Sequence, residues 1–494
     1  MIKEYLAITI GPIDKTIAKA SKAQEVWVSS YMFSYLMGLL LMEISSRKIG
    51  RIILPNIALL ENEKTYYGAG VFNDRCIVEL DKKFDISDFE SLRNRVIEDF
   101  LTGKQLKSFA EPEDPRSGRD TEDTRQSLKL SAETLKDYLQ IYGLVTAFDV
   151  EKDSIINKIN NLLNGLERQL VYQSKNNTTV EQIFNNVTWF YPLGFVPDNK
   201  DTKKPDNWEN KRTHCVAHIN VDNIKQYYEW IGNDWDKAGI FNNCLMTIAK
   251  ESAKIVRDFG GLPFFMAGDD LFFLAPMLTT VKDVNYNIFD LIQILDFLFK
   301  DVFSKNNIQP PTFSCGIFIS NNKYHLADAI SNSKDLLSKA KNMPSKNSLA
   351  VQLAYSGGKT CSATFNKNKN ASFDDFIELL KDFPTKEYYV SSVRKKIHDN
   401  LTLLKAIGKD NPPDYSGFFN NELMMTGIEN NSKRLFLDRS SKIFTAIFKE
   451  QKSRYTVQKT LLDDETIAKA GEEAVRQLDS IYKLLDFLIH PEHV

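Results

Sequence analysis

The segment Gly261–Met277, GLPFFMAGDDLFFLAPM, constrains the fold most because it places two adjacent carboxylates between two apolar runs. Both runs have the composition of buried strands, and Gly268 supplies a tight turn between them. Successive side chains of a strand point to opposite faces, so Asp269 and Asp270 can serve one site only at a turn. The segment therefore predicts a buried β-hairpin that carries both aspartates at its apex.

A second strand precedes this hairpin in HCVAHINVD, residues 214–222. Apolar residues alternate there with polar ones, so Asn220 and Asp222 share the polar face. Strands and helices follow one another from residue 214 in the order β-α-β-β-α-β, with a further helix and strand behind them. This order predicts a ferredoxin-like palm in which Asp222 lies beside the hairpin.

Three carboxylates above one sheet would repel one another unless a cation lay among them. Carboxylate oxygens, completed by substrate phosphates, are the ligands of Mg²⁺ or Mn²⁺ in phosphoryl transfer. Asp222, Asp269 and Asp270 are therefore the predicted ligands of a metal-nucleotide site. A bare GDD is more often an ordinary hairpin turn, and the flanking strands together with the in-phase Asp222 favour the metal site.

The rest of the chain alternates between mixed and helical segments. Strand patterns at 5–10, 51–57 and 75–80 and a helix between them predict an α+β unit, and the uncharged run 26–42 is expected to be a buried helix rather than a membrane span. Helical periodicity predicts paired helices over 128–145 and 155–170. We predict two ferredoxin-like palms interleaved with helical domains: palm 1–125, helical 126–205, palm 206–360 and helical 361–494.

Charge and cysteine content limit the classes of partner and cofactor. The net charge is −2, so RNA contact has to be local or shared with other proteins. The five cysteines are scattered singly, without the spacing of a zinc site or a disulfide framework. We therefore expect a cytoplasmic protein without zinc.

Several blocks resemble one family. AGDDLFFLAP (267–276), SCGIFISNNKYHLADAISNSKDLLSKAKN (314–342) and KNSLAVQL (346–353) resemble the palm of the large polymerase/cyclase subunit, the "Cas ten" family, of type III CRISPR effector complexes. The segment IGPIDKTIAKASKAQEVWVSSYMFSYL (10–36) is similar to the first palm-like domain of the Cmr, or type III-B, branch. The resemblance implies two palm-like domains, each followed by helical domains.

The resemblance also implies an activity. When guide RNA (crRNA) pairs with a target RNA within the complex of Cmr-type subunits, the palm of this family joins ATP into short, usually cyclic, oligoadenylates. Asp269 and Asp270 would be catalytic and, with Asp222, would hold the metal. We also predict nucleotide-binding roles for Gly268, Asn220, Gly11 and Ser30, and for Lys341 and Lys346, which match the basic positions of the family's AK…KN block.

Two departures from the family pattern keep other functions open. Ala267 replaces the first of two glycines that usually precede the aspartates, and Asn220 stands where many relatives have Asp. A catalytically degenerate scaffold that senses RNA is one alternative, and a stand-alone nucleotidyl cyclase of the GGDEF or adenylyl cyclase type is another. The sequence opens directly on the first palm, so a histidine-aspartate nuclease domain is not expected.

Overall fold

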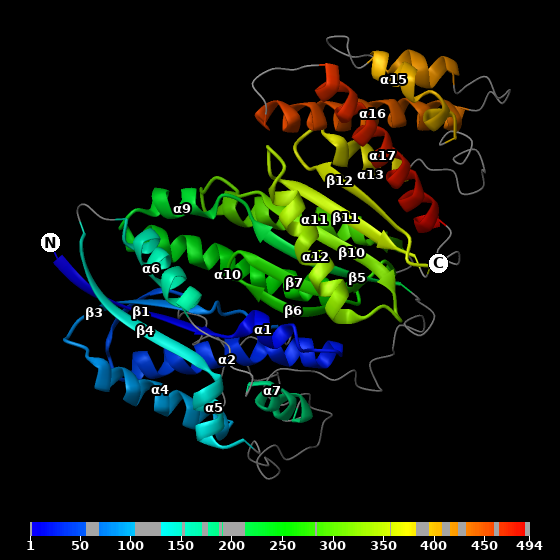
Figure 1. Cartoon of the computed structure of the whole chain (residues 1–494). Coiled ribbons are helices and arrows are strands. Elements are labelled where there is room, and N and C mark those ends of the chain that lie inside the picture. The colour runs from blue at the N-terminus through cyan, green and yellow to red at the C-terminus, as the bar shows by residue number, and fades with distance from the viewer. Residues whose placement is uncertain are drawn as a thin grey trace. The chain divides into compact units, whose positions relative to one another are not determined.

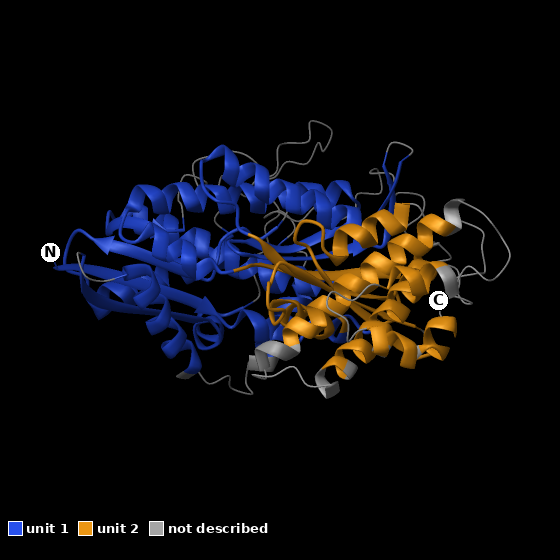
Figure 2. Ribbon diagram, turned by 90° about the horizontal axis from the view of Figure 1, so that it is seen from above, with its two compact units in different colours: residues 1–211, 223–311, 325–328 blue, residues 212–222, 312–324, 329–494 orange. Residues whose placement is uncertain are grey.

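The computed structural model describes residues 2–55, 69–103, 130–150, 154–169, 176–186, 190, 213–281, 284–355, 357–381, 395–407, 415–422, 431–458 and 464–489. The chain forms two compact units, drawn in blue and orange in Figure 2. Unit 1 comprises residues 1–211, 223–311 and 325–328, and unit 2 comprises residues 212–222, 312–324 and 329–494. The predicted domain boundaries near 125 and 205 lie outside the described residues.

Unit 1 contains the first palm (Figure 1). Its strands are β1 (Ile2–Gly11), β2 (Gly50–Leu54), β3 (Arg75–Leu80) and β4 (Gln140–Asp149), in the sheet order β2-β3-β1-β4. Neighbouring strands in this sheet are antiparallel. The helices of this part are α1 (Ile13–Ile17), α2 (Ala23–Ser46), α4 (Ile86–Leu101) and α5 (Ala132–Tyr138). This is the sheet order of a ferredoxin-like fold, so the predicted first palm is confirmed.

The prediction of a helix over 128–145 is wrong. Helix α5 ends at Tyr138, and the ten residues of β4 follow almost at once. All ten residues of β4 pair with β1, from Ile2 opposite Asp149 to Gly11 opposite Gln140. Pairing with a distant strand therefore overrides the local helical pattern of this segment.

Unit 1 also holds the central elements of the second palm. They are α9 (Ile224–Ile231), α10 (Trp235–Asp258), β6 (Leu262–Ala267), β7 (Asp270–Pro276), β8 (Leu278–Val281), β9 (Val284–Asn287) and α11 (Ile288–Lys305). Helices α6 (Ile155–Gln169) and α7 (Asn176–Asn185) belong to the same unit. Along the chain, β5 (Thr213–Val221), α10, β6, β7, α11 and β10 (Phe313–Asn321) follow the order β-α-β-β-α-β, which confirms the predicted α+β class.

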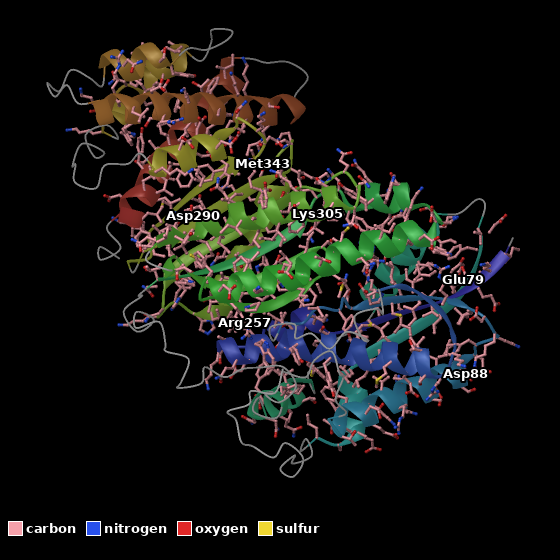
Figure 3. All side chains as sticks on the ribbon, turned by 180° about the vertical axis from the view of Figure 1, so that it is seen from behind. Glu79, Asp88, Arg257, Asp290, Lys305 and Met343 are labelled. Atoms are coloured by element: carbon pink, nitrogen blue, oxygen red, sulfur yellow. The ribbon has the colours of Figure 1, made fainter. Side chains whose placement is uncertain are left out.

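Glu79 on β3, which Figure 3 labels, joins the first palm to α10. Its carboxylate accepts hydrogen bonds from Lys3 Nζ at 2.5 Å, from Tyr5 OH at 3.2 Å and from Trp235 Nε1 at 3.1 Å. The Tyr5 and Trp235 rings also meet edge to face, with centroids 6.3 Å apart. One partly buried carboxylate thus fixes where α10 begins against the first sheet.

Helix α2 is long and apolar enough to cross a membrane by length and composition. In its most apolar window 83% of the residues are nevertheless buried inside the protein. Ser30 on this helix donates to the carbonyl oxygen of Phe264 on β6, and Ser34 accepts from the main-chain N–H groups of Val71 and Phe72 at 2.9 and 2.8 Å. Its small polar residues therefore serve close packing, as expected for a core helix.

Unit 2 is built on four strands. They are β5 (Thr213–Val221), β10 (Phe313–Asn321), β11 (Ser348–Ala354) and β12 (Thr360–Asn366), in the order β12-β11-β10-β5. Strand β10 runs parallel to β11 and antiparallel to β5. A Cβ at Gly316 on β10 would lie 2.2 Å from the main-chain nitrogen of Leu337, so glycine permits the close approach of α12 (Leu326–Lys341).

The remaining elements of unit 2 are mostly helical. They are α13 (Ser372–Lys381), α15 (Leu401–Ile407), a short π-helix (Phe418–Glu422), α16 (Asn431–Gln458) and α17 (Asp464–Ile489). Sequence analysis places a helical domain from residue 361, whereas the structure places most of strand β12 there before the helices begin.

Candidate nucleotide-binding site

The predicted hairpin is present in unit 1. Ala267 on β6 pairs with Asp270 on β7, which leaves Gly268 and Asp269 as a two-residue loop. Gly268 has a φ of +58°, and glycine at the first loop position is typical of a type II′ hairpin turn. Asp269 is partly buried in this loop, whereas Asp270 is exposed as the first residue of β7.

A segment of the first palm lies against the hairpin. Met266 donates its main-chain N–H to the carbonyl oxygen of Gly70 at 2.9 Å. A Cβ at Gly268 would lie 2.2 Å from Nδ2 of Asn73, so no larger residue fits there without displacing that side chain. The residues that lead into β3 and the loop that carries Asp269 therefore belong to one packed arrangement.

A cavity of about 450 Å³ opens at this place. Cavities of about 300–1,000 Å³ hold small ligands, so its size suits a mononucleotide. Its lining comes from the chain before and within β3, from helices α6, α9 and α10, and from the hairpin loop. The polar lining residues are Asn73, Asp74, Arg75, Asn157, Asn160, Asn161, Asn164, Lys225, Tyr228, Asn242 and Asp269.

Electrostatic coupling links the hairpin to the other walls of this cavity. Burial raises the pKa of the Asp74 carboxyl to about 6, Arg75 opposes this, and the negative charges of Glu167 and Asp269 reinforce it. Burial and the Asp269 charge also raise the pKa of the Tyr228 hydroxyl. Asp74 and Asp269 therefore act on each other through the cavity, and a cation between them would relieve their repulsion.

Two predicted nucleotide-binding residues of the first palm lie elsewhere. Gly11 lines a separate cavity of about 190 Å³, together with Asp14, Lys15, Asp74 and Glu167. Ser30 is fully buried in α2, and its hydroxyl donates to main-chain oxygens of Trp27 and Phe264. The structure therefore gives Ser30 a packing role and does not bring Gly11 into the larger cavity.

Asp222 belongs to unit 2, where its carboxylate is hydrogen-bonded on both oxygens. Oδ2 accepts from Thr312 Oγ1 and from the main-chain N–H of Asn347, each at 2.9 Å, and Oδ1 accepts from Ser314 Oγ at 2.8 Å. The residue is only 2% exposed. Its carboxylate thus joins the end of β5 to β10 and to the start of β11, which is a structural use of the charge.

The other predicted residues of unit 2 lie around the same strand ends. Lys341 at the end of α12 points its ammonium at the carbonyl oxygen of Val221, at 3.4 Å. Lys346 adopts a left-handed conformation, with a φ of +47°, in the turn before β11. Asn220 is half-buried on β5 opposite Ser314. Asn220, Lys341 and Lys346 are thus each partly accessible.

The acidic residues of the hairpin suit a hard cation that takes its remaining ligands from water and substrate. Among the described residues, no group of three or more His, Cys, Asp or Glu side chains is arranged to hold a metal ion. Mg²⁺ commonly takes one or two protein carboxylates and completes its shell with water and substrate phosphates. Asp269 and Asp270 provide carboxylates of this kind. All five cysteines are buried as free thiols.

Sequence reasoning missed Asp74, Arg75 and the asparagines of α6. Asp74 and Arg75 gave no signal, because they approach the hairpin only through the packing of distant segments. The asparagines did give one, since Asn157, Asn160, Asn161 and Asn164 recur at the spacing of a single helix face.

Comparison with known proteins agrees with the two palms. The family model "CRISPR-associated protein Cmr2, N-terminal" matches residues 5–96, and "Cas10/Cmr2, second palm domain" matches residues 218–350. No curated protein matches the sequence.

Two solved structures share the fold at low identity. One is the type III-B Cmr-beta complex in the apo state, at 10% identity and a TM-score of 0.50, covering 87% of this chain and 78% of that chain. The other is Cmr-beta bound to cognate target RNA, at 10% identity and a TM-score of 0.52, and the match covers 90% of this chain and 83% of that chain. The two family matches follow the order of the two palms along the chain, so the chain carries a Cmr2 N-terminal domain and a Cas10/Cmr2 second palm domain.

Proposed function

We propose that this chain is the metal-dependent nucleotidyltransferase of a type III-B CRISPR effector complex, which joins ATP into oligoadenylates, usually cyclic, when target RNA is bound. The supporting observation is the cavity of unit 1, which has the size for a nucleotide and has the Gly268-Asp269 loop in its wall. The fold and family agree with this activity, since palms of this kind carry nucleotidyl transfer.

The proposed partners follow from the relatives. A structurally similar chain comes from a Cmr-beta complex bound to cognate target RNA. We propose the same surroundings for this chain, namely guide RNA, target RNA and the smaller Cmr-type subunits. A net charge of −2 supports shared rather than independent RNA binding.

The proposed reaction forms one phosphorus-oxygen bond and breaks another. A ribose hydroxyl of one ATP attacks the α-phosphorus of a second ATP, loses its proton, and pyrophosphate leaves with the electrons of the broken bond. Asp269 and Asp270 would hold Mg²⁺ or Mn²⁺, which when bound neutralises charge that develops on the phosphate oxygens. Lys225 in the cavity wall is placed to contact a phosphate. Lys341 and Lys346 remain proposed phosphate contacts of unit 2.

The test is the double variant Asp269→Ala with Asp270→Ala in the assembled complex. With labelled ATP, Mg²⁺ or Mn²⁺ and matching target RNA, we expect no nucleotide product, while assembly and RNA binding are retained. Removing two carboxylates relieves repulsion in the metal-free protein, so the fold should be unharmed. Asp236→Ala, which removes an aspartate whose side chain is 94% exposed, should retain full synthesis. Wild-type synthesis by the double variant would place the catalytic site elsewhere.

Two observations favour a second candidate, a catalytically degenerate scaffold. Ala267 replaces a glycine beside the aspartates, and the oxygens of Asp222 are already engaged by three hydrogen bonds. Absence of any ATP-derived product from the wild-type complex, with either metal, would support the scaffold. Synthesis by the isolated chain without RNA would instead support a stand-alone cyclase.

Asn220→Asp is a companion variant, and we expect it to tighten metal dependence if this side chain faces the metal.

A further inference from the structure

Helix α6 turns a row of asparagines toward the cavity of unit 1. Asn157, Asn160, Asn161 and Asn164 all line it, at the i, i+3, i+4, i+7 spacing of one helix face. The apolar residues Ile159 and Leu163 of the same helix are fully buried. Asparagine is a poor residue for a helix interior, so helix formation does not account for four of them in two turns.

Arg75 sets the orientation of two of these amides. Its Nη1 donates to Asn160 Oδ1 at 3.2 Å, and its Nη2 donates to Asn164 Oδ1 at 2.6 Å. A guanidinium group has donors only, so both amides must present their oxygens to Arg75. The NH₂ group of each amide is consequently its other end, so its two donors are not used by Arg75.

The charge of Arg75 is already used within the protein. Its Nε and Nη2 donate to the two oxygens of Glu167 at 3.2 and 2.8 Å. With the two asparagine bonds, four of the five guanidinium N–H groups are engaged. Arg75 is therefore a positioning residue that holds the amides, rather than the group that binds a phosphate.

The amide row is uncharged, whereas the acidic hairpin loop forms another part of the same lining. Phosphates with their metal belong beside the carboxylates, and the neutral donors suit the uncharged end of a nucleotide. We infer that the asparagine face of α6 is the surface that recognises the nucleoside end of the substrate, through hydrogen bonds from its amides to acceptor atoms of the base or the ribose. The identity of this ligand as a nucleotide rests on the proposed function.

The test measures binding of ATP, adenosine and inorganic tripolyphosphate to the full-length chain. Asn161→Ala removes a lining amide other than the two that Arg75 contacts. The variant should bind ATP and adenosine about fivefold more weakly, which is the effect of one neutral hydrogen bond. Asn164→Asp keeps an oxygen for Arg75 and removes the NH₂ group, so it should weaken adenosine while the fold stays intact. Binding of tripolyphosphate to Asn161→Ala should be unchanged.

Leu162→Ala is the matched control, because Leu162 lies on the same helix, is 44% exposed and does not line the cavity. It should bind all three ligands as the wild type does. Adenine and 2′-deoxyadenosine separate the two sources of acceptors. If Asn161→Ala also weakens the binding of adenine, the contact lies on the base. If it does not weaken the binding of 2′-deoxyadenosine, the contact lies on the 2′-hydroxyl of the ribose.

Wild-type adenosine binding by both asparagine variants would overturn the inference, and so would a loss confined to tripolyphosphate. The proposed function fails separately, because it depends on product formation. If the wild-type complex binds ATP but makes no product, the proposed catalysis is refuted. Weaker adenosine binding by Asn161→Ala would in that case still support the asparagine face as a recognition surface.

Discussion

At the scale of the residue, Gly268 determines where the aspartates of the hairpin can lie. Its left-handed φ of +58° closes the two-residue loop, and its missing side chain leaves room for Asn73. Either requirement alone selects glycine at this position. The loop that carries Asp269 is therefore fixed both by its own turn and by the first palm.

We predict that Gly268→Ala destabilises the protein by about 1–3 kcal/mol, because it combines a strained φ with a clash against Asn73. Chemical denaturation, monitored by circular dichroism, measures this loss. Gly239→Ala is the control: it lies within α10, an added Cβ there would meet nothing within 4 Å apart from the adjacent helix backbone, and the variant should be more stable by about 0.5–1 kcal/mol. Equal stability of Gly268→Ala and wild type would mean that Asn73 yields without cost.

The single residues show what sequence can predict about this site. Strand, turn and strand around Asp269 follow from local patterns, and the structure confirms them. The hydrogen bonds of Asp222 do not follow, because Thr312 is 90 residues away and Asn347 is 125 residues away. Local patterns identify candidate side chains, whereas tertiary contacts decide which of their atoms remain available.

At the scale of the element, strands with strong β composition were predictable and one strand with a helix-like pattern was not. The predicted strand 75–80 coincides with β3, and the predicted strands of the hairpin match β6 and β7 closely. In β4, apolar residues such as Ile141 and Leu144 fit helical spacing, yet antiparallel pairing with β1 decides the outcome. Such pairing depends on residues more than a hundred positions away and leaves no local trace.

Helix α16 carries a partly buried carboxyl group, Glu450, whose charge is unfavourable. Burial raises the pKa of Glu450 to about 7, although hydrogen bonding from Ser372 acts in the opposite direction. Ser372 Oγ donates to Glu450 Oε1 at 3.0 Å, while Oε2 has no hydrogen-bond partner among the described residues. The folded protein therefore binds this proton more tightly than the unfolded chain does.

The pH dependence of stability follows from this shift. The raised pKa of Glu450 adds to the free energy of unfolding in full below the unfolded pKa of 4.5, where the carboxyl is protonated in both states. This stabilisation is lost as the pH rises to about 7. We predict that Glu450→Gln is more stable than wild type by up to about 3 kcal/mol at pH 8 and nearly equal to it near pH 4.5. Urea denaturation at both pH values measures the difference. A Glu450→Gln effect that does not depend on pH would contradict the assignment.

At the scale of the whole molecule, charge balance governs how RNA is held. With 63 basic and 65 acidic residues, the chain offers little net attraction to a polyanion. We predict that the isolated chain binds guide RNA weakly and that this binding falls steeply between 50 and 200 mM salt, as measured by filter binding. The assembled complex should bind far more tightly at the same salt. Tight, salt-resistant binding by the chain alone would show that it holds RNA without partners.

The interleaving of the two units has a consequence during synthesis. Strand β5 belongs to unit 2, but the chain returns to unit 1 for residues 223–311 before β10, the strand that pairs with β5, is made. Asp222 and its partner Thr312 are separated by 90 residues, and ribosomes add about 5–20 residues per second, so β5 waits for β10 for roughly 5–20 s. Throughout that time the β10-facing edge of β5 lacks its final partner, which makes it a natural place for a chaperone to protect the nascent protein.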